Sequence, residues 1–297
     1  MTTFVSIVAV GLVYAVQLGL IALSFSITYR AIGFANFAHV QFAAVGATVT
    51  VALAYVIPIW LSVIVAVFAA GLLAVGADLL IFRRVRQAPI GTKMIVSAGL
   101  LLLTQAAIQF LWGVNPRIYA GGTGGITIAG VSIGYDQIVI VGIGAVVFAA
   151  FHQIMKNTAA GRLIRATADS PELAESRGVN SGLVVTQVWF LAGALAALGG
   201  ALLGIQIPVD PLFGQQILIP MFAATVLGGL GSPMGAIAGA LVLSFGQAAL
   251  LDINFGSFLG RVWHVPSQYQ SVLQFLLLIA VLAVRPWGLF GTSRERA

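Results

Sequence analysis

Long apolar stretches make up most of this chain, and they limit its fold more than any other feature. A helix that crosses a bilayer needs about 20 mainly apolar residues. Runs of about this length occupy residues 4–29, 59–82, 94–112, 137–155 and 183–205. Hydrophobic residues form 60% of the chain and charged residues only 7%, against about a quarter in soluble domains. We therefore expect a polytopic membrane protein.

The pattern within these runs indicates the kind of span. A strand of a transmembrane barrel alternates apolar and polar residues, and these runs do not alternate. The expected class is therefore all-α. Residues 37–56 and 269–284 add two spans, and residues 217–251 indicate two short helices separated by glycines. We expect eight or nine transmembrane helices, some of them short and broken, in a single domain over residues 1–297.

Basic residues are confined almost entirely to alternate connections. Of the 14 basic residues, all but Arg117 and Arg261 lie at residue 30, in residues 83–93 or 156–182, or after the last span. Cytoplasmic connections of membrane proteins carry an excess of Lys and Arg. These connections are therefore predicted to be cytoplasmic, with the N-terminus outside and the C-terminus inside. The net charge of +6 has the same origin and does not indicate nucleic-acid binding.

Residues 156–182 form the longest polar segment of the chain. The segment contains seven charged residues, four basic and three acidic. Thr158 is placed to cap a first short helix, and Ser170 followed by Pro171 is typical of the start of a second. On this pattern the segment is either a solvated loop or a docking element for a soluble partner. Two capped helices favour docking, because a simple connection does not need them.

Polar side chains interrupt the apolar pattern after the first span. Asn36, His39 and Gln41 lie near the start of the second span, where polar groups are costly in lipid. They either bond between helices or line a pathway for a solute. A second interruption contains Gly228, Gly229, Gly231 and Ser232. Because no Lys follows these glycines, we interpret them as a close crossing of two helices and not as a phosphate loop.

Several motifs, in order along the chain, resemble those of bacterial branched-chain amino acid ABC transporter permeases. Residues 158–180, T-x2-G-R-x2-R-A-x2-D-x8-G-V-N, are similar to the coupling loop of that family. Asn36-Phe-Ala-His39 resembles the family's asparagine–histidine motif, and the basic stretch 83–86 lies where the family has one. Residues 226–232 and 285–291 match two further signatures. The resemblance therefore extends over most of the chain.

The resemblance implies the transmembrane subunit of an ATP-binding cassette importer of the branched-chain amino acid and ribose type. Such a subunit moves branched-chain or related small amino acids across the bacterial cytoplasmic membrane. It is not an enzyme and holds no cofactor or metal, since ATP and Mg²⁺ are used by separate cytosolic ATPase subunits. Other implied partners are a homologous second permease and an extracytoplasmic solute-binding protein. The residues implied to form the ATPase-coupling loop are Thr158, Gly161, Arg162, Arg165, Ala166, Asp169, Glu172 and Gly178.

Three alternatives remain open on the sequence. The same importer role would serve urea, short amides or another small organic solute, because Val40-Gln41 departs from the glycine and glutamate of the family. A secondary transporter driven by ions needs ionisable residues deep in the spans, and only Asp78 and His39 come near. A membrane enzyme lacks a catalytic constellation, and the isolated His152 and His264 do not predict a metal site.

Overall fold

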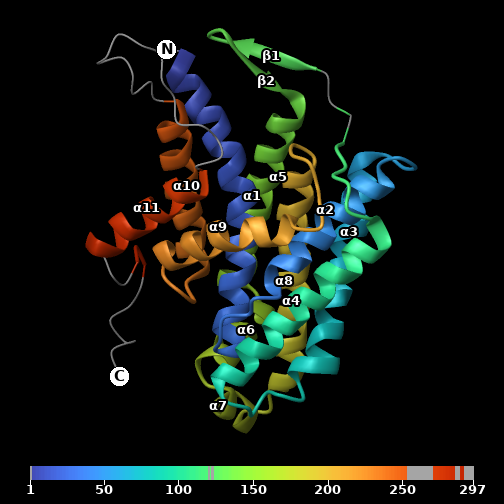
Figure 1. The fold of residues 1–297 in the computed structure, drawn as a ribbon. Helices are drawn as coiled ribbons and strands as arrows, with labels where there is room; N and C mark the ends of the chain where they lie inside the picture. The colour runs from blue at the N-terminus through green and yellow to red at the C-terminus, as the bar shows by residue number, and fades with distance from the viewer. Residues whose placement is uncertain (1, 120, 122–123, 253–269, 285–287, 291–297) are drawn as a thin grey trace.

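The computed structural model describes residues 2–119, 121, 124–252, 270–284 and 288–290 and shows a bundle of helices with one small hairpin (Figure 1). The helices are α1 (Thr2–Ile32), α2 (His39–Leu53), α3 (Ile59–Ala77), the π-helical turn η1 (Asp78–Phe82), α4 (Ile90–Trp112), α5 (Tyr135–Asn157), α6 (Ala159–Asp169), α7 (Pro171–Ser176), α8 (Ser181–Gly204), α9 (Phe213–Gly228), α10 (Pro233–Asp252) and α11 (Gln270–Val284). The hairpin strands β1 (Gly125–Ile128) and β2 (Val131–Gly134) lie between α4 and α5. Arg261 and His264 lie outside the described residues.

The described residues contain six helices that are long and apolar enough to cross a membrane, namely α1, α3 with η1, α4, α5, α8 and α10. Two shorter apolar helices, α2 and α9, have 15 and 16 residues, fewer than the roughly 20 of a full crossing. The predicted polytopic all-α class with short broken helices is confirmed. In Figure 1, α9 runs across α1 instead of alongside it, which favours the lower of the two expected helix counts.

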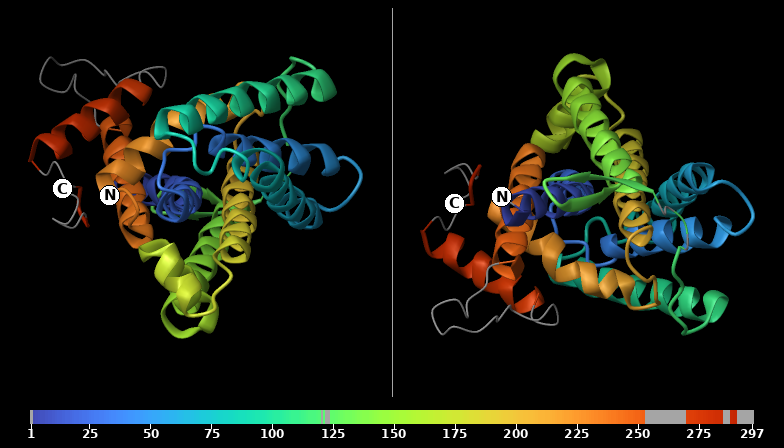
Figure 2. Two further views of the ribbon diagram at one scale, coloured as in Figure 1. Left: turned by 90° about the horizontal axis from the view of Figure 1, so that it is seen from below. Right: turned by 90° about the horizontal axis from the view of Figure 1, so that it is seen from above.

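Helix α1 forms the centre of the bundle. It packs against α5, α8, α9 and α10, and Figure 2 shows it among the other helices when the bundle is seen along its length. Its middle residues Leu20, Ile21 and Leu23 have no exposed surface. A helix that is apolar on every side belongs in a core or in lipid. The sequence of α1 therefore fits the most enclosed position of this fold.

Small residues bring pairs of helices into backbone contact. Where α2 crosses α8, a side-chain carbon added at Gly46 would overlap the backbone of Ala197, and one added at Gly200 would overlap the carbonyl of Ala43. A carbon added at Gly239 of α10 would overlap the backbone of α9 in the same way. Membrane helices associate by such close packing of small residues. These glycines therefore help to decide which helices are neighbours.

The glycine-rich connection between α4 and α5 folds into a hairpin that the sequence analysis did not predict. Strands β1 and β2 pair antiparallel, and the turn residues Ala129 and Gly130 have φ angles of 49° and 83°. Two successive positive φ angles are typical of the tight turn that matches the twist of paired strands. Arg117 lies over the Trp112 ring, 5.2 Å from its centre, and forms a backbone bridge with Val209. The hairpin lies at the same end of the bundle as the N-terminus (Figure 1).

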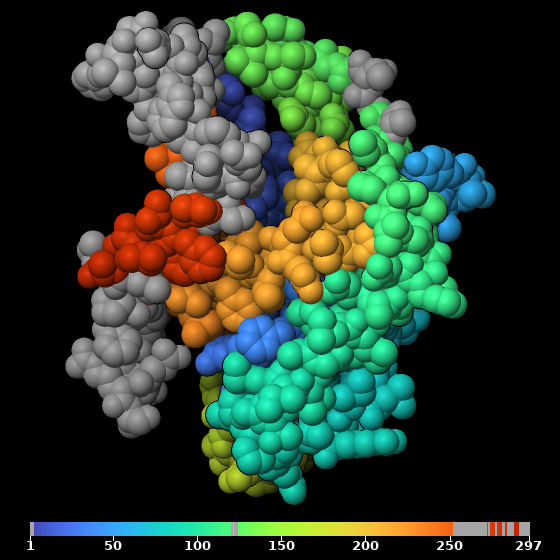
Figure 3. Space-filling model, in the orientation of Figure 1, coloured from blue at the N-terminus to red at the C-terminus, as the bar shows by residue number. Residues whose placement is uncertain are grey.

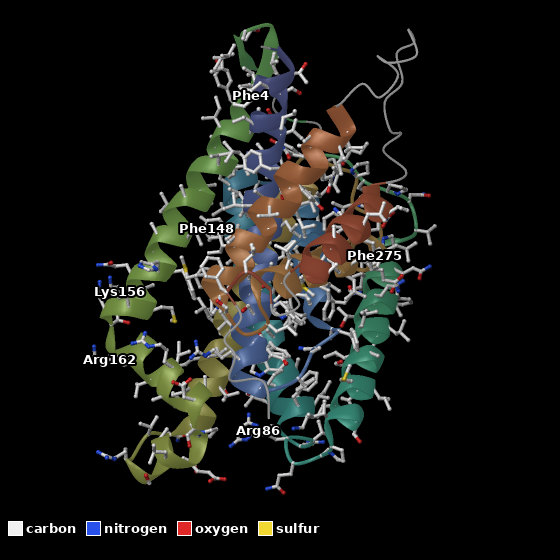
Figure 4. All side chains as sticks on the ribbon, turned by 90° about the vertical axis from the view of Figure 1, so that its left-hand side faces the viewer. Phe4, Arg86, Phe148, Lys156, Arg162 and Phe275 are labelled. Carbon is white, nitrogen blue, oxygen red and sulfur yellow. The ribbon has the colours of Figure 1, made fainter. Side chains whose placement is uncertain are left out.

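Basic side chains gather at the opposite end of the bundle, which also carries α6 and α7 and is called the basic end. Figure 4 shows Arg86, Lys156 and Arg162 toward this end and Phe4 at the hairpin end, with Phe148 and Phe275 between them. Helices α3 and α4 expose leucines along the middle of the molecule. An apolar belt between two polar ends is the arrangement that a bilayer requires. The fold thus separates charge along the direction of the spans.

Candidate functional site

The predicted caps shape the two short helices at the basic end. The Thr158 hydroxyl oxygen accepts a hydrogen bond from the Gly161 backbone N–H at 3.1 Å, and the hydroxyl donates to the Ile154 carbonyl at 2.7 Å. Thr158 therefore ends α5 and begins α6. Ser170 accepts from the Leu173 N–H at 3.3 Å, and Pro171 is the first residue of α7. The sequence prediction of two separately capped helices is confirmed.

Three of the predicted coupling residues hold α6 onto the bundle. Gly161 packs so closely on the end of α5 that an added side-chain carbon would overlap the Ile154 and Met155 carbonyls. Arg165 donates a hydrogen bond to the Met155 carbonyl. Arg30 of α1 donates to Asp169 at 2.8 Å. These side chains attach α6 to α5 and α1, so in this structure Arg165 and Asp169 are engaged within the chain.

Other coupling residues point away from the bundle. Arg162, Ala166 and Glu172 are exposed. Leu163 and Leu173 are 39% and 63% exposed beside them, although leucine is normally an inward residue in a polar helix of this kind. We call Arg162, Leu163, Ala166, Glu172 and Leu173 the α6–α7 surface. Neither leucine was among the predicted coupling residues. The signal in the sequence was an apolar residue on the charged side of a short amphipathic helix.

Short-range backbone contacts set the end of α7 and the start of α8. Gly178 has a φ of 80°, a conformation that favours glycine at the end of a helix. The Val179 N–H then donates to the Ala174 carbonyl at 3.1 Å. Asn180 caps α8 by accepting from the Leu183 N–H at 3.0 Å. The chain therefore leaves α7 by a defined turn and enters α8 directly.

A small crevice connects α6 to the places where two other helices end or begin. It is lined by Arg30 and Ala31 at the end of α1, by Ile164 and Arg165 of α6, and by Pro233, the first residue of α10. The predicted glycine break at residues 228–232 therefore lies beside α6. A displacement of α6 would press on α1, which α6 contacts directly, since packed interiors transmit small shifts.

The glycine break is the close helix crossing that the sequence indicated. Gly229 and Gly231 have φ angles of 105° and 76°. A side-chain carbon added at Gly228 would overlap the Gly235 carbonyl, so α9 and α10 touch through their backbones. Ser232 caps α10 by accepting from the Gly235 N–H at 3.2 Å. These four predicted residues reverse the chain between α9 and α10. Of the two short helices expected here, only α9 is short, because α10 has 20 residues and is long enough to cross a membrane.

The two C-terminal sequence motifs meet in space. The Leu289 N–H donates to the Leu227 carbonyl at 2.8 Å, and the Phe290 N–H donates to the Gly228 carbonyl at 3.0 Å. Gly288 has a φ of 74° and fits against the same turn. The carbonyls at the end of a helix need such partners. The described part of the second motif therefore completes the end of α9, and its remaining residues lie outside the described ranges.

The polar residues of the first break are buried. Asn36 accepts from the Ala38 N–H at 3.0 Å, and a ring nitrogen of His39 bonds with the Ser24 hydroxyl at 2.7 Å. Gln41 lies against Gly214 of α9, and its amide has no partner among the described residues. The His39 contact joins α2 to α1 and favours a bond between helices, one of the two roles that the sequence left open, whereas the Asn36 bond stays within its own turn.

The carboxylate of Asp78 is also hydrogen-bonded within the bundle. Its side chain is 1% exposed, and its two oxygens accept from Arg86 at 3.2 Å and from Thr186 of α8 at 3.0 Å. Burying a carboxylate is costly unless it is paired and hydrogen-bonded. Asp78 therefore ties η1 to α8 near the basic end.

A large cavity toward the hairpin end was not predicted. Its volume is about 690 Å³, and α1, α5, α8, α9, α10 and α11 all contribute residues to it. The glutamines that line it are Gln17, Gln137, Gln206, Gln216, Gln247 and Gln274. Figure 3 looks onto a face where α1 is visible in a hollow beside α8 and α9. We call this space the glutamine cavity.

The glutamines form two bonded groups within the glutamine cavity. Gln17 donates to Gln206 at 2.9 Å, and Gln274 donates to Gln247 at 2.6 Å. Gln274 also donates to the Tyr14 hydroxyl at 3.2 Å. None of the described residues that line the cavity carries a formal charge at neutral pH. The signal in the sequence was the repeated occurrence of amides within apolar helices.

Together, the membrane-crossing bundle, the capped helices projecting from its basic end and a cavity between the spans, lined by amides and aliphatic residues, define a membrane transport permease. The chain belongs to the family described as branched-chain amino acid transport system / permease component, whose model matches residues 7–282. The resemblance noted in the sequence motifs is therefore confirmed for the chain as a whole.

Relatives cover nearly the full length of the chain. It is 31% identical over 298 residues to the high-affinity branched-chain amino acid transport system permease protein BraD of Pseudomonas aeruginosa, covering 95% of this chain and 94% of the relative. It is 27% identical over 301 residues to the corresponding LivH protein of Escherichia coli, covering 96% and 93%. Among solved structures, PsaBC from Streptococcus pneumoniae in complex with Fab matches with a TM-score of 0.51 at 16% identity, over 96% of this chain and 94% of that chain. The last similarity concerns the fold alone.

Proposed function

We propose that this chain is the transmembrane subunit of an ATP-binding cassette importer that moves branched-chain or related small amino acids across the bacterial cytoplasmic membrane. Family membership and the names of relatives that match end to end support this cargo. The observation that carries the proposal is the α6–α7 surface. It exposes two leucines on a firmly attached pair of helices at the basic end, where a soluble ATPase subunit would cover them.

The proposed topology follows the distribution of charge. The basic end, with α6 and α7, faces the cytoplasm, and the hairpin end with the N-terminus faces outward. Cytosolic ATPase subunits dock at residues 156–182 and use ATP and Mg²⁺, so this chain is not itself an enzyme. A solute-binding protein delivers cargo at the hairpin end. A homologous second permease encloses the pathway together with this chain.

The contacts of α6 supply a route by which ATPase movement reaches the pathway. Arg165 bonds α6 to the end of α5, and Asp169 adds an exposed ion pair with Arg30 of α1, so α6 contacts both spans. Helix α6 packs on α1, and α1 in turn packs against both α9 and α10. Both α10 and α9 line the glutamine cavity. A shift of the α6–α7 surface would therefore reach α9 and α10 through α1, the helix that α6 shares with them.

ATP-driven uptake tests this proposal. The chain is reconstituted in liposomes with its ATPase and permease partner subunits, and the solute-binding protein is supplied on the opposite side. We expect uptake of labelled leucine that requires ATP on the side of α6 and α7 and stops when this chain is omitted. Uptake that follows a proton or sodium gradient without ATP would overturn the proposal in favour of a secondary transporter.

A further inference from the structure

We propose that the glutamine cavity is a binding subsite for the transported solute and that it selects small solutes of no net charge with an aliphatic part. This inference rests on the proposed function, because it assigns the cavity to the cargo of an importer. The cavity volume of about 690 Å³ lies within the range of about 300–1,000 Å³ that is usual for small-molecule sites. A neutral aliphatic amino acid, in its zwitterionic form, meets each of the conditions that follow.

The first condition is a set of polar groups that still need partners. Gln247 is bonded through its carbonyl oxygen, which leaves its NH₂ group for another acceptor. The carbonyl oxygen of Gln274 and the hydroxyl of Ser244 are buried and have no partner among the described residues. Buried polar groups of this kind are normally satisfied. A solute that offers both donors and acceptors would satisfy them, as the ammonium and carboxylate groups of an amino acid do.

Helix α9 adds a further acceptor beside the amides. Pro220 lies inside this helix and lines the cavity together with Gln216. Because proline has no N–H, the carbonyl of Gln216 lacks its normal partner one turn further along. Freed carbonyls in membrane helices are tolerated where they line a cavity or find another partner. An ammonium group is a suitable donor to such an oxygen.

The second condition is an apolar wall for an aliphatic side chain. This part of the lining consists of Val10, Val13, Leu203, Ile207, Ile217, Ala248 and Leu251. An aliphatic side chain gains free energy when it leaves water for such a surface. A purely polar solute would gain nothing from this wall. The combination of amides and aliphatic residues therefore favours aliphatic amino acids over urea.

The third condition is the lack of formal charge in the described lining. A solute with a net charge would enter without a counterion, and an unpaired buried charge is very costly. The opposite charges of a zwitterion lie close together and partly compensate each other, and side-chain amides can bond to both. The cavity should therefore discriminate against lysine and glutamate while accepting leucine.

Two glutamine variants distinguish the effect of a change in the glutamine cavity from the effect of the same change elsewhere in the bundle. Gln247→Glu keeps the oxygen that accepts from Gln274 and replaces the free NH₂ group by an anionic oxygen. Gln105→Glu is the control for the same substitution outside the cavity lining, because the oxygen of Gln105 accepts from Gln215 at 2.7 Å in a more exposed bond between α9 and α4. Ser244→Ala, which removes only one hydroxyl, is a second cavity variant that keeps the fold.

ATP-driven uptake of labelled leucine is measured for each reconstituted variant. We expect Gln247→Glu to lower uptake at limiting leucine about tenfold and Ser244→Ala to lower it about threefold, because each loses a bond to the solute. Gln105→Glu should stay within about twofold of the unmodified transporter, because this half-buried residue does not line the cavity. Unlabelled valine should compete with leucine, whereas lysine, glutamate and acetamide should not.

The outcomes distinguish this inference from the proposed function. If the unmodified transporter shows ATP-driven leucine uptake but both cavity variants match Gln105→Glu, the subsite is overturned and the importer assignment stands. Effective competition by lysine or glutamate would also overturn it. Competition by acetamide alone would keep an uncharged cargo but overturn the aliphatic amino acid. If the unmodified transporter shows no ATP-driven uptake of any solute, the proposed function itself fails.

Discussion

Replacing Leu163 and Leu173 together by serine tests the α6–α7 surface at the two positions that give it apolar area. Their side chains are 39% and 63% exposed, together about the surface of one fully exposed leucine. Burying one leucine side chain contributes about 2 kcal/mol. If an ATPase subunit covers both residues, the double variant should bind it about 30-fold more weakly, since about 1.4 kcal/mol corresponds to a tenfold change in Kd.

The assay titrates the purified permease in nanodiscs with the ATPase subunit and measures the binding by biolayer interferometry. Leu183→Ser is the matched control, because Leu183 of α8 is 55% exposed but lies outside the α6–α7 surface. Its Kd should stay within about twofold of the unmodified protein. The double variant should keep the Tm of the isolated permease, since both leucines already face solvent there. Equal Kd values for the double variant and the control would refute the assignment of this surface.

Three further predictions follow from the fold. Gly200→Val should lower the yield and Tm of the purified protein, because overpacking costs about 1–3 kcal/mol. The control Gly99→Val should have little effect, because a side-chain carbon added at Gly99 meets no neighbour within 4 Å. Equal losses of yield and Tm in both variants would contradict the close crossing of α2 and α8. An impermeant maleimide should label Thr127→Cys in intact cells and Ala160→Cys only after permeabilisation, and the reverse pattern would invert the topology. Asp169→Asn should change unfolding stability by about 1 kcal/mol or less, as expected for an exposed ion pair, and a large loss of Tm would show that this contact matters more than its exposure indicates.

The sequence predicted what depends on local pattern. The spans could be found because about 20 apolar residues are needed to cross a bilayer, whatever the helix packs against. The caps Thr158 and Ser170 could be found because a capping side chain bonds within its own turn. The break at residues 228–232 could be found because glycines permit positive φ angles and close backbone contact. Each of these features is fixed by neighbouring residues in the chain.

Features that depend on packing between distant segments were not accessible in this way. Arg165 and Asp169 lie on an amphipathic helix, and only the positions of α5 and α1 decide that they bond to these helices. The crosswise course of α9 arises from its contacts with α1, α2 and α10. The glutamine cavity combines amides that are up to 257 residues apart, from Gln17 to Gln274. Such a cluster has no local spacing by which a sequence could reveal it.

Site-directed crosslinking tests the central claim most directly, because the chain contains no native cysteine. Leu173→Cys carries a photoactivatable maleimide in the assembled transporter, and Leu103→Cys, at a 64% exposed leucine on α4 in the apolar belt, is the control. We predict an adduct with the ATPase subunit from position 173, altered by ATP, and none from position 103. Absence of the adduct at position 173, or equal adducts at both positions, would contradict an ATPase-coupled permease that docks through α6 and α7.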